Sequence, residues 1–202
     1  GSITKVDFYN GTTLIGSIAT GQAGNTGNNY TFSWANAASG SYTLSAIATD
    51  NQNTSTTSIP VSVNVNALPM VALTSPLNNS SVNVGTPIIL SASASDNDGS
   101  ISQVDFYNGT TLIGTVLAGS AGDTGSGYTT TWPNVAPGTY QLTAKATDNN
   151  GARVTTAAVT VTVNATAATI YYIHPDHLGT PRVITTSDAT NTKVWEWKNE
   201  DA

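Results

Sequence analysis

The sequence predicts an all-β protein in which two similar β-sandwich units follow one another along the chain. Threonine, serine, asparagine, alanine, valine and glycine dominate, and only 9% of the 202 residues are charged, a mixture typical of strands and turns. Shifting the chain by about 98 residues aligns residues 1–67 with 99–165 without a gap, with about 38 of the 67 positions identical, which indicates a tandem duplication. Within residues 139–147, apolar and polar side chains alternate as expected for a half-buried strand.

The first two strands of each copy form a predicted hairpin. The run VDFYNGTTLIG occupies residues 6–16 and 104–114, and each run contains an Asn-Gly pair between two strand-like segments. We expect type I′ turns at Asn10-Gly11 and Asn108-Gly109, since Asn-Gly is the usual sequence of a turn with positive φ at both central residues.

Further short strands complete the second copy. Residues 71–73, 88–94 and 159–163 are apolar or alternating, which gives seven strands in about 98 residues, the number typical of an immunoglobulin-like sandwich. Tyr140 follows Pro137-Gly138 and is placed like a tyrosine corner. Trp34, Trp132, Tyr42 and Tyr140 are interpreted as core and corner residues rather than a carbohydrate-binding platform.

The first copy has no counterpart of residues 68–98. The predicted fold is therefore tandem immunoglobulin-like β-sandwiches, the first lacking its first two strands, plus a short C-terminal β-hairpin-like segment; the expected divisions are residues 1–66, 67–165 and 166–202. A sheet without these strands exposes unpaired edges and an apolar face. Two sources for the missing strands stay open: the sequence is one frame of a longer polypeptide, or another subunit donates the strands.

A family resemblance supports this interpretation. The segment VDFYNGTTLIGT…YTTTWPNVAPGTYQLTAKATDNNGA, ending in VTVTVNA, resembles the bacterial Ig-like domains found in many copies in surface and secreted proteins. The resemblance covers residues 1–165. It implies spacing, adhesion or presentation of another module and no chemistry of its own.

The tail is a different kind of segment. YYIHPDHLGTPRVIT…VWEW resembles RHS/YD repeats, which implies short strands that belong to a larger β-sheet shell. We expect strands near residues 170–176, 181–187 and 192–198. A single repeat buries its faces only against neighbours, so the tail is predicted to supply an assembly interface through six residues: Tyr171, Tyr172, His174, Arg182, Trp195 and Trp197. A tail that completed the first sandwich of another copy would build open filaments.

Charge and composition exclude several classes of partner. The net charge is −6, and the six Lys and Arg residues are scattered, so the chain lacks the basic surface that nucleic acid binding requires. No apolar run approaches the roughly 18 residues of a membrane span, and membrane insertion is not expected. There is no Cys, which excludes disulfides and thiolate metal sites.

No cofactor is expected, with calcium as the one candidate. Asp96-Asn97-Asp98-Gly99 and Asp148-Asn149-Asn150-Gly151 group oxygen donors at strand ends, and carboxylate and carbonyl oxygens are the ligands that calcium prefers. Asp96, Asp98 and Asp148 are the predicted ligands; the alternative is that these residues form ordinary turns. A metal or catalytic site at His174, Asp176 and His177 is not favoured, because zinc requires three or four converging ligands. No motif predicts catalysis, so the protein is expected not to be an enzyme.

Three hypotheses for function stay open, all at the cell surface or outside the cell. The first is a non-catalytic stalk or fibre subunit whose partners are other copies of itself or neighbouring domains of the same parent chain. The second is an adhesin module that binds a surface ligand, with its site in the Gly-rich loops at residues 19–29 and 117–127; the alternative for these loops is that they are long, mobile hairpin connections. The third is a fragment of an RHS-type polymorphic toxin.

Overall fold

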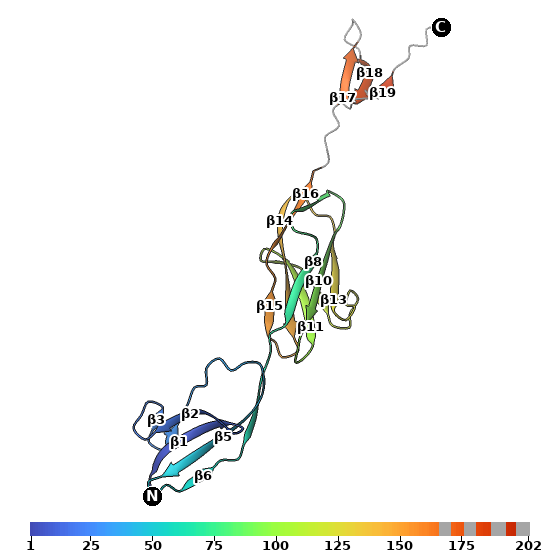
Figure 1. The fold of residues 1–202 in the computed structure, drawn as a ribbon. Coiled ribbons are helices and arrows are strands. Elements are labelled where there is room, and N and C mark those ends of the chain that lie inside the picture. Colours follow the sequence, from blue (N-terminus) through green and yellow to red (C-terminus); the bar gives the residue numbers. More distant parts are fainter. Residues whose placement is uncertain (166–170, 176–180, 187–192, 197–202) are drawn as a thin grey trace, which may run out of the picture.

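The computed structural model describes residues 1–165, 171–175, 181–186 and 193–196. Throughout these residues the regular structure consists of β-strands, with no helix, so the all-β prediction is confirmed. The strands form three groups in chain order (Figure 1): a first unit with strands between residues 3 and 65, a second unit with strands between 70 and 164, and a tail sheet. Figure 1 shows the first and second units end to end, joined by a short linker.

The second unit is a complete two-sheet sandwich. One sheet has the order β13-β10-β8 and the other the order β12-β11-β14-β16-β9, with β15 also pairing with β14. The bounds of its strands are β8 (Met70–Ser75), β9 (Ser80–Asn83), β10 (Ile88–Ser95), β11 (Ile101–Asn108), β12 (Thr111–Leu117), β13 (Gly127–Trp132), β14 (Gly138–Asp148), β15 (Arg153–Thr155) and β16 (Val159–Asn164).

The two sheets enclose one apolar core because their inward positions alternate with outward ones. In β10, Ile88, Leu90, Ala92 and Ala94 are buried while the residues between them are exposed or half-buried. They pack against β11, β14 and β16 of the facing sheet, whose buried apolar side chains include Phe106, Leu142 and Val161 at 0% exposure. This period of two places every second residue in the core.

The second unit has nine strands, two more than the seven predicted. The additional strands β9 and β15 are four and three residues long. β9 pairs in parallel with β16, from Ser80↔Val161 to Asn83↔Asn164, so it is held by tertiary pairing. Its sequence, SSVN, is too short to show an alternating pattern.

The first unit contains one main sheet. Its order is β2-β1-β5-β6, with β7 also pairing with β5, and β3 and β4 form a separate two-stranded ribbon. The bounds of its strands are β1 (Ile3–Asn10), β2 (Thr13–Ala19), β3 (Asn25–Thr26), β4 (Asn29–Tyr30), β5 (Gly40–Asp50), β6 (Ser55–Thr57) and β7 (Val61–Val65). The strands β1, β2, β5 and β6 correspond residue for residue to β11, β12, β14 and β15 at the 98-residue offset.

Lack of a partner shortens one strand of the first unit. In the second unit β13 runs from Gly127 to Trp132 and pairs along its length with β10. At the corresponding positions in the first unit, strand β4 stops at Tyr30, and the described first unit has no counterpart of β10 for the rest to pair with. A strand needs its ladder of hydrogen bonds, so the same sequence pattern stays irregular here.

The predicted hairpins are confirmed, but the predicted turn type is wrong. Asn10 pairs with Thr13, so the two-residue loop is Gly11-Thr12, not Asn10-Gly11. Gly11 has φ of +57°, whereas Thr12 is not among the residues with positive φ. A glycine in the first central position is typical of a type II′ turn. Gly109, with φ of +56°, occupies the same position in the second unit.

Both predicted aromatic corners form. The hydroxyl of Tyr140 donates a hydrogen bond of 2.7 Å to the carbonyl oxygen of Ala136, and Tyr42 makes the same bond to Ala38. Trp132 meets Tyr140 edge to face with ring centres 5.1 Å apart, as Trp34 meets Tyr42 at 4.8 Å. All four rings are half-buried, so they border the core rather than fill it.

The described residues of the tail form three strands, as predicted. They are β17 (Tyr171–Pro175), β18 (Pro181–Thr186) and β19 (Lys193–Glu196), in the order β17-β18-β19 with antiparallel pairing. The register aligns Ile173 with Ile184, and Ile184 with Trp195.

Candidate functional site

The first unit presents an open apolar face on its main sheet. We define the open face as seven residues whose counterparts lie in the core of the second unit: Val6, Phe8, Leu44, Ala46, Ala48, Val63 and Val65. The corresponding core residues Val104, Phe106, Leu142, Ala144, Ala146, Val161 and Val163 are at most 3% exposed. On the open face only Val6 is buried.

The duplication makes this comparison an internal control. Val63 is 39% exposed and Val161 is 0% exposed. Both residues lie in the last strand of their unit, within the same alternation of valine and polar residues. Outside the open face, Ile3 is 39% exposed, whereas its counterpart Ile101 is 6% exposed. The difference follows from the sheet that β8, β10 and β13 form over the second unit's core, which has no counterpart in the first unit.

Phe32 covers part of the open face. Its ring stacks on Phe8 with centres 5.8 Å apart and approaches Gly16, yet Phe32 itself is 36% exposed. A hollow of about 290 Å³ with a mostly apolar lining lies beside it, bounded by Phe8, Leu44, Ala46 and Val61 among others. The cover is therefore incomplete, and Val61 stays 57% exposed.

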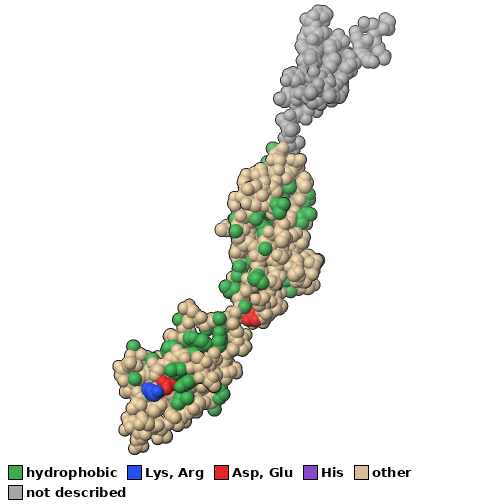
Figure 2. Space-filling view, in the orientation of Figure 1, with side chains coloured by type: hydrophobic (Ala, Val, Ile, Leu, Met, Phe, Trp, Pro, Cys, Tyr) green, Lys and Arg blue, Asp and Glu red, His purple; other side chains and the backbone are tan. Residues whose placement is uncertain are grey.

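The predicted calcium ligands gather at the end of the second unit that faces the linker. Asp96 and Asp98 lie in the loop between β10 and β11, and Asp148 ends β14. Figure 2 shows an acidic patch where the linker enters the second unit. The topology brings the two loops together, because β11 and β14 are neighbours and Ile101 pairs with Asp148.

The linker itself takes part in this cluster. Asn66 follows β7, and its side-chain amide donates a 2.7 Å hydrogen bond to Oδ2 of Asp148. The backbone N–H of Ala67 donates to Oδ2 of Asp98 at 2.9 Å. The side-chain oxygen of Asn66 accepts from the amide of Asn150. Both acidic loops are thus bonded to the linker.

Asp96 is the unusual member of the cluster. Each of its carboxylate oxygens exposes less than 1 Å² and has no hydrogen-bond partner. Burial, followed by the negative charges of Asp98 and Asp148, raises the pKa of Asp96 above its ordinary value. A buried acceptor without a donor is costly, so the ionised form of Asp96 is disfavoured in this environment.

Asp148 is buried at 2% exposure but is well supplied with donors. Its Oδ1 accepts backbone hydrogen bonds from Asn150 at 2.9 Å and Ala152 at 2.8 Å. Burial alone would raise the pKa of Asp148, but the hydrogen bonds from Asn66 and from these backbone groups hold it below its ordinary value. The alternative prediction, that these residues form turns, therefore also describes Asp148.

The three carboxylates do not by themselves form a metal-binding site. Among the described residues, no three His, Cys, Asp or Glu side chains converge closely enough to hold an ion by themselves. The ion pairs found there are Lys5–Asp7 and Lys145–Asp105, so no basic side chain neutralises Asp96, Asp98 or Asp148 in this part of the chain. A cation at this place would need the oxygen of Asn66 or water as additional ligands.

Sequence reasoning missed a second acidic position, Asp105 and its counterpart Asp7. Asp105 is 5% exposed and lies 3.2 Å from Nζ of Lys145 across the β11–β14 pair. Asp7 instead takes Lys5, two residues away on its own strand, at 2.7 Å. The signal was in the duplication: each copy has one Lys, at a different position, and the two Lys residues pair with counterpart carboxylates. Each pair compensates the charge of a buried Asp side chain.

Neither Gly-rich segment, residues 19–29 or 117–127, contains an aromatic residue. Residues 117–127 connect β12 of one sheet to β13 of the other, so the hairpin interpretation of this loop is wrong. Asp123 caps the loop by accepting from the backbone N–H groups of Gly119 and Gly125, both at 2.7 Å. The nearest aromatic residue, Tyr128, is 2% exposed.

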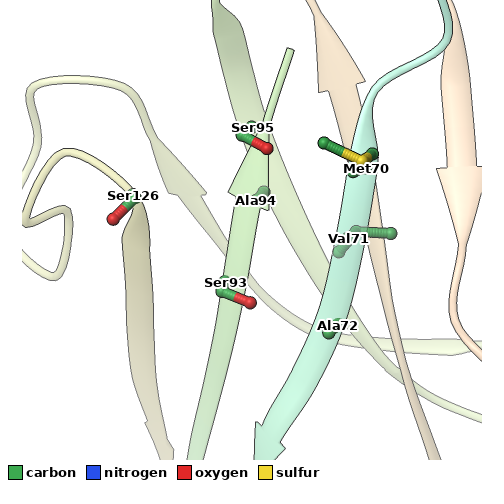
Figure 3. A pocket seen from close by; sticks show the side chains of 7 residues that line it. All are labelled: Met70, Val71, Ala72, Ser93, Ala94, Ser95 and Ser126. Carbon is green, nitrogen blue, oxygen red and sulfur yellow. The ribbon is translucent and has the colours of Figure 1, made fainter. Parts of the chain in front are cut away.

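A shallow hollow of about 210 Å³ lies beside the same end of the second unit. Figure 3 shows that its walls come from the adjacent strands β8 and β10, with Ser126 across from them. The lining consists mainly of alanine and serine side chains with Met70 and Val71. It offers neither charge nor an aromatic platform for a specific ligand.

The predicted interface residues of the tail are placed by their strands. Tyr171, Tyr172 and His174 lie on β17, Arg182 on β18 and Trp195 on β19, while Trp197 lies outside the described residues. Asp176 and His177 also lie outside them. The assembly role of these residues stays a prediction. No helix long and apolar enough to cross a bilayer occurs in the described part of the chain.

Several solved structures are similar to this chain. Among solved structures, the fibronectin(III)-like modules of Clostridium thermocellum CbhA are 29% identical, with 86% of this chain and 84% of that chain covered and a TM-score of 0.44. Titin domains z1z2 in complex with telethonin are 17% identical, covering 83% and 90% with a TM-score of 0.36. Domains 4–9 of the surface layer protein SbsC are 21% identical, covering 80% and 26% with a TM-score of 0.33. Curated protein sequences include no match to this chain.

The sequence profile of one family matches inside the second unit. Residues 69–144, from the strand β8 into β14, match the family described as "Bacterial Ig domain". The second unit, with its two sheets and its tyrosine corner, is thus an immunoglobulin-like sandwich, and most of it is similar in sequence to that bacterial family.

Proposed function

We propose that this chain is a non-catalytic structural module of a bacterial surface or extracellular protein, acting in a stalk or fibre. The expected divisions at residues 1–66, 67–165 and 166–202 are part of this proposal. A stalk needs rigid units joined end to end and surfaces through which they contact neighbours. The second unit supplies the rigid element and the first unit supplies a contact surface.

The open face carries the proposal. Seven apolar positions that the second unit buries are, apart from Val6, left partly exposed in the first unit. Large exposed apolar surfaces mark interaction sites or cause aggregation. The second unit also shows what covers such a face: a sheet made by residues 68–98 together with β13. The natural cover is therefore a pair of strands with the sequence character of residues 68–98.

The strands that cover the open face can come from two sources. They can belong to the same polypeptide, or another copy can donate strands, including those of the tail, as in fibres built by strand exchange. The resemblance of the tail to RHS/YD repeats belongs to this second arrangement, since such repeats bury their faces against neighbours.

The experiment compares three chains by sedimentation velocity and negative-stain electron microscopy over a hundredfold range of concentration. The first is the 202-residue chain, the second ends at Ala165, and the third carries a duplicate of residues 68–98 fused directly before Gly1. Because Gly1 aligns with Gly99, this fusion reproduces the junction of the second unit.

Strand-mediated assembly predicts that the first chain self-associates and that the fusion is monomeric. Ordered filaments that require residues 166–202 would identify the tail as the donor. Association that persists unchanged in the chain ending at Ala165 and disappears in the fusion would point to a cover from the same polypeptide. A first chain that stays monomeric and soluble at all concentrations would contradict the proposal, because an uncovered face of this size would then need no partner.

A further inference from the structure

The linker between the two units is short and partly buried. Residues 66–69 separate the end of β7 from the start of β8. Asn66 and Ala67 are half-buried, and Pro69 is buried. The ring of Pro69 fixes its own φ and restricts the backbone of Leu68 before it. This linker therefore differs from the Gly/Ser-rich segments that let neighbouring domains move independently.

Two neighbouring linker residues donate hydrogen bonds to both loops at the end of the second unit. The side-chain amide of Asn66 donates to Oδ2 of Asp148 at 2.7 Å, and the backbone N–H of Ala67 donates to Oδ2 of Asp98 at 2.9 Å. The amide of Asn150 donates back to Oδ1 of Asn66. Two of these three bonds end on carboxylates, and such charge-assisted bonds are stronger than neutral ones. We call these five residues the linker clamp.

The second unit shapes the main acceptor of the clamp by itself. Oδ1 of Asp148 accepts two backbone N–H groups of its own turn, which leaves Oδ2 for the linker. The first unit builds the same turn at Asp50, whose Oδ1 accepts the backbone N–H groups of Gln52 and Thr54 at 2.8 and 2.9 Å, where the described residues include no preceding linker. The turn does not depend on the linker, so docking requires little further ordering of the acceptor.

The repeat provides a contrasting case. Asn164 and Ala165 are the counterparts of Asn66 and Ala67 at the 98-residue offset. Both Asn164 and Ala165 are exposed, whereas Asn66 and Ala67 are half-buried. The same pair of residues is thus covered where it meets the acidic loops. This difference indicates that the contact with the second unit, and not the Asn-Ala sequence alone, fixes the linker.

From these contacts we infer that the linker-facing end of the second unit is a docking surface for the Asn-Ala end of a preceding unit of the same repeat, and that the linker clamp holds the two units in one orientation. The partner is a unit of this chain's own kind, recognised through one side-chain amide and the backbone N–H that follows it. The inference goes beyond the proposed stalk role, because it assigns the stiffness of the joint to particular bonds and does not depend on the open face.

The test measures the distance between two spin labels in the 202-residue chain by double electron–electron resonance. The chain has no Cys, so labels attach only at introduced Cys residues. The inter-unit pair is Thr43→Cys with Thr131→Cys, two exposed strand positions. The reference pair within the second unit is Leu117→Cys with Thr131→Cys, since Leu117 is 53% exposed. Labelled chain is diluted into an excess of unlabelled chain, so that association between copies does not contribute.

The inter-unit distance distribution should be as narrow as that of the reference pair. Asn66→Ala removes two of the three bonds and should raise the undocked population by about one to two orders of magnitude, which broadens the inter-unit distribution. Asn66→Asp keeps the shape of the side chain but sets a second negative charge against Asp148, so it should broaden the distribution as well. The matched control Asn164→Ala changes the exposed counterpart and should leave the distribution narrow. The reference pair should stay narrow in every variant, because Asn66 lies outside the strands of both units.

Three results would overturn the inference: a broad inter-unit distribution in the parent chain beside a narrow reference pair; an inter-unit distribution that stays narrow in both Asn66 variants; or equal broadening by Asn164→Ala. These results leave the stalk proposal's own test untouched, because that proposal rests on the open face of the first unit. Conversely, the clamp would hold the two units in one orientation even if the first unit never associates.

Discussion

Replacing Phe106 and Phe8 by alanine measures how much of each unit's core is enclosed. The two residues are counterparts in the duplication, and each lies centrally in its sheet. Phe106 is 0% exposed, so Phe106→Ala removes a complete ring from a closed core at a cost of about 3–5 kcal/mol. Phe8 is half-buried and meets one aromatic neighbour, Phe32. Its replacement should cost about 1–2 kcal/mol, because roughly half of the ring's transfer free energy is at stake and little cavity forms.

Hydrogen exchange read by mass spectrometry separates the two units, because peptides from β5 and β14 report local opening of each sheet. Phe106→Ala should accelerate exchange in β14 by about two to three orders of magnitude, at roughly 1.4 kcal/mol per factor of ten. Phe8→Ala should accelerate exchange in β5 by about tenfold. Equal effects of both substitutions would refute the reasoning, since Phe8 would then lie under a complete cover.

Three further predictions concern the second unit. Tyr140→Phe deletes the hydroxyl that donates to Ala136 and should lower the free energy of unfolding by about 1 kcal/mol, measured by urea denaturation. Gly109→Ala should cost about 1 kcal/mol or more by the same assay, because Gly109 has φ of +56° and alanine is strained there. Lys145→Met should destabilise the unit by about 1–3 kcal/mol at pH 7, since it leaves the charge of Asp105 unpaired. Burial would raise the pKa of Asp105, but its hydrogen bonds hold that pKa below the ordinary 3.8. The stabilisation that the ionised Asp105 gives the folded unit is therefore complete above pH 3.8 and is lost as the pH falls through the lower folded-state pKa. The cost of Lys145→Met should shrink in acid accordingly.

The sequence was most informative where local pattern and tertiary structure agree. Alternation in residues 139–147 identified β14, and the spacing of Tyr140 after Pro137-Gly138 identified the corner bond. The duplication also indicated that the first unit lacks part of its sandwich. The lack of a partner for the counterpart of β13 is the direct structural consequence.

Features that depend on contacts between distant residues were not predictable from pattern. The strand β9 is held by parallel pairing with β16, about eighty residues away. The Asn-Gly pairs suggested a type I′ turn, but the pairing of Asn10 with Thr13 moves the loop by one residue. Hence one glycine, and not the Asn-Gly pair, takes the positive φ.

The acidic cluster at the linker was predictable only in part, for the same reason. Asp96, Asp98 and Asp148 were singled out because acidic residues beside glycine at strand ends are a local signal; their role as metal ligands stays a prediction. Asn66 was missed, because its bond to Asp148 joins residues 82 positions apart. Its position as the penultimate residue of the repeated block gave no indication that the linker turns back onto the loops.

The most direct test of the central claim, that the first unit is a sandwich awaiting its second sheet, is hydrogen exchange in the chain with residues 68–98 duplicated before Gly1. The account predicts that amides of β1 and β5 gain protection and approach the level of β11 and β14, because the added strands cover the open face. Unchanged exchange in β1 and β5, with β11 and β14 as the internal reference, would show that strands of this kind do not complete the first unit and would contradict the account.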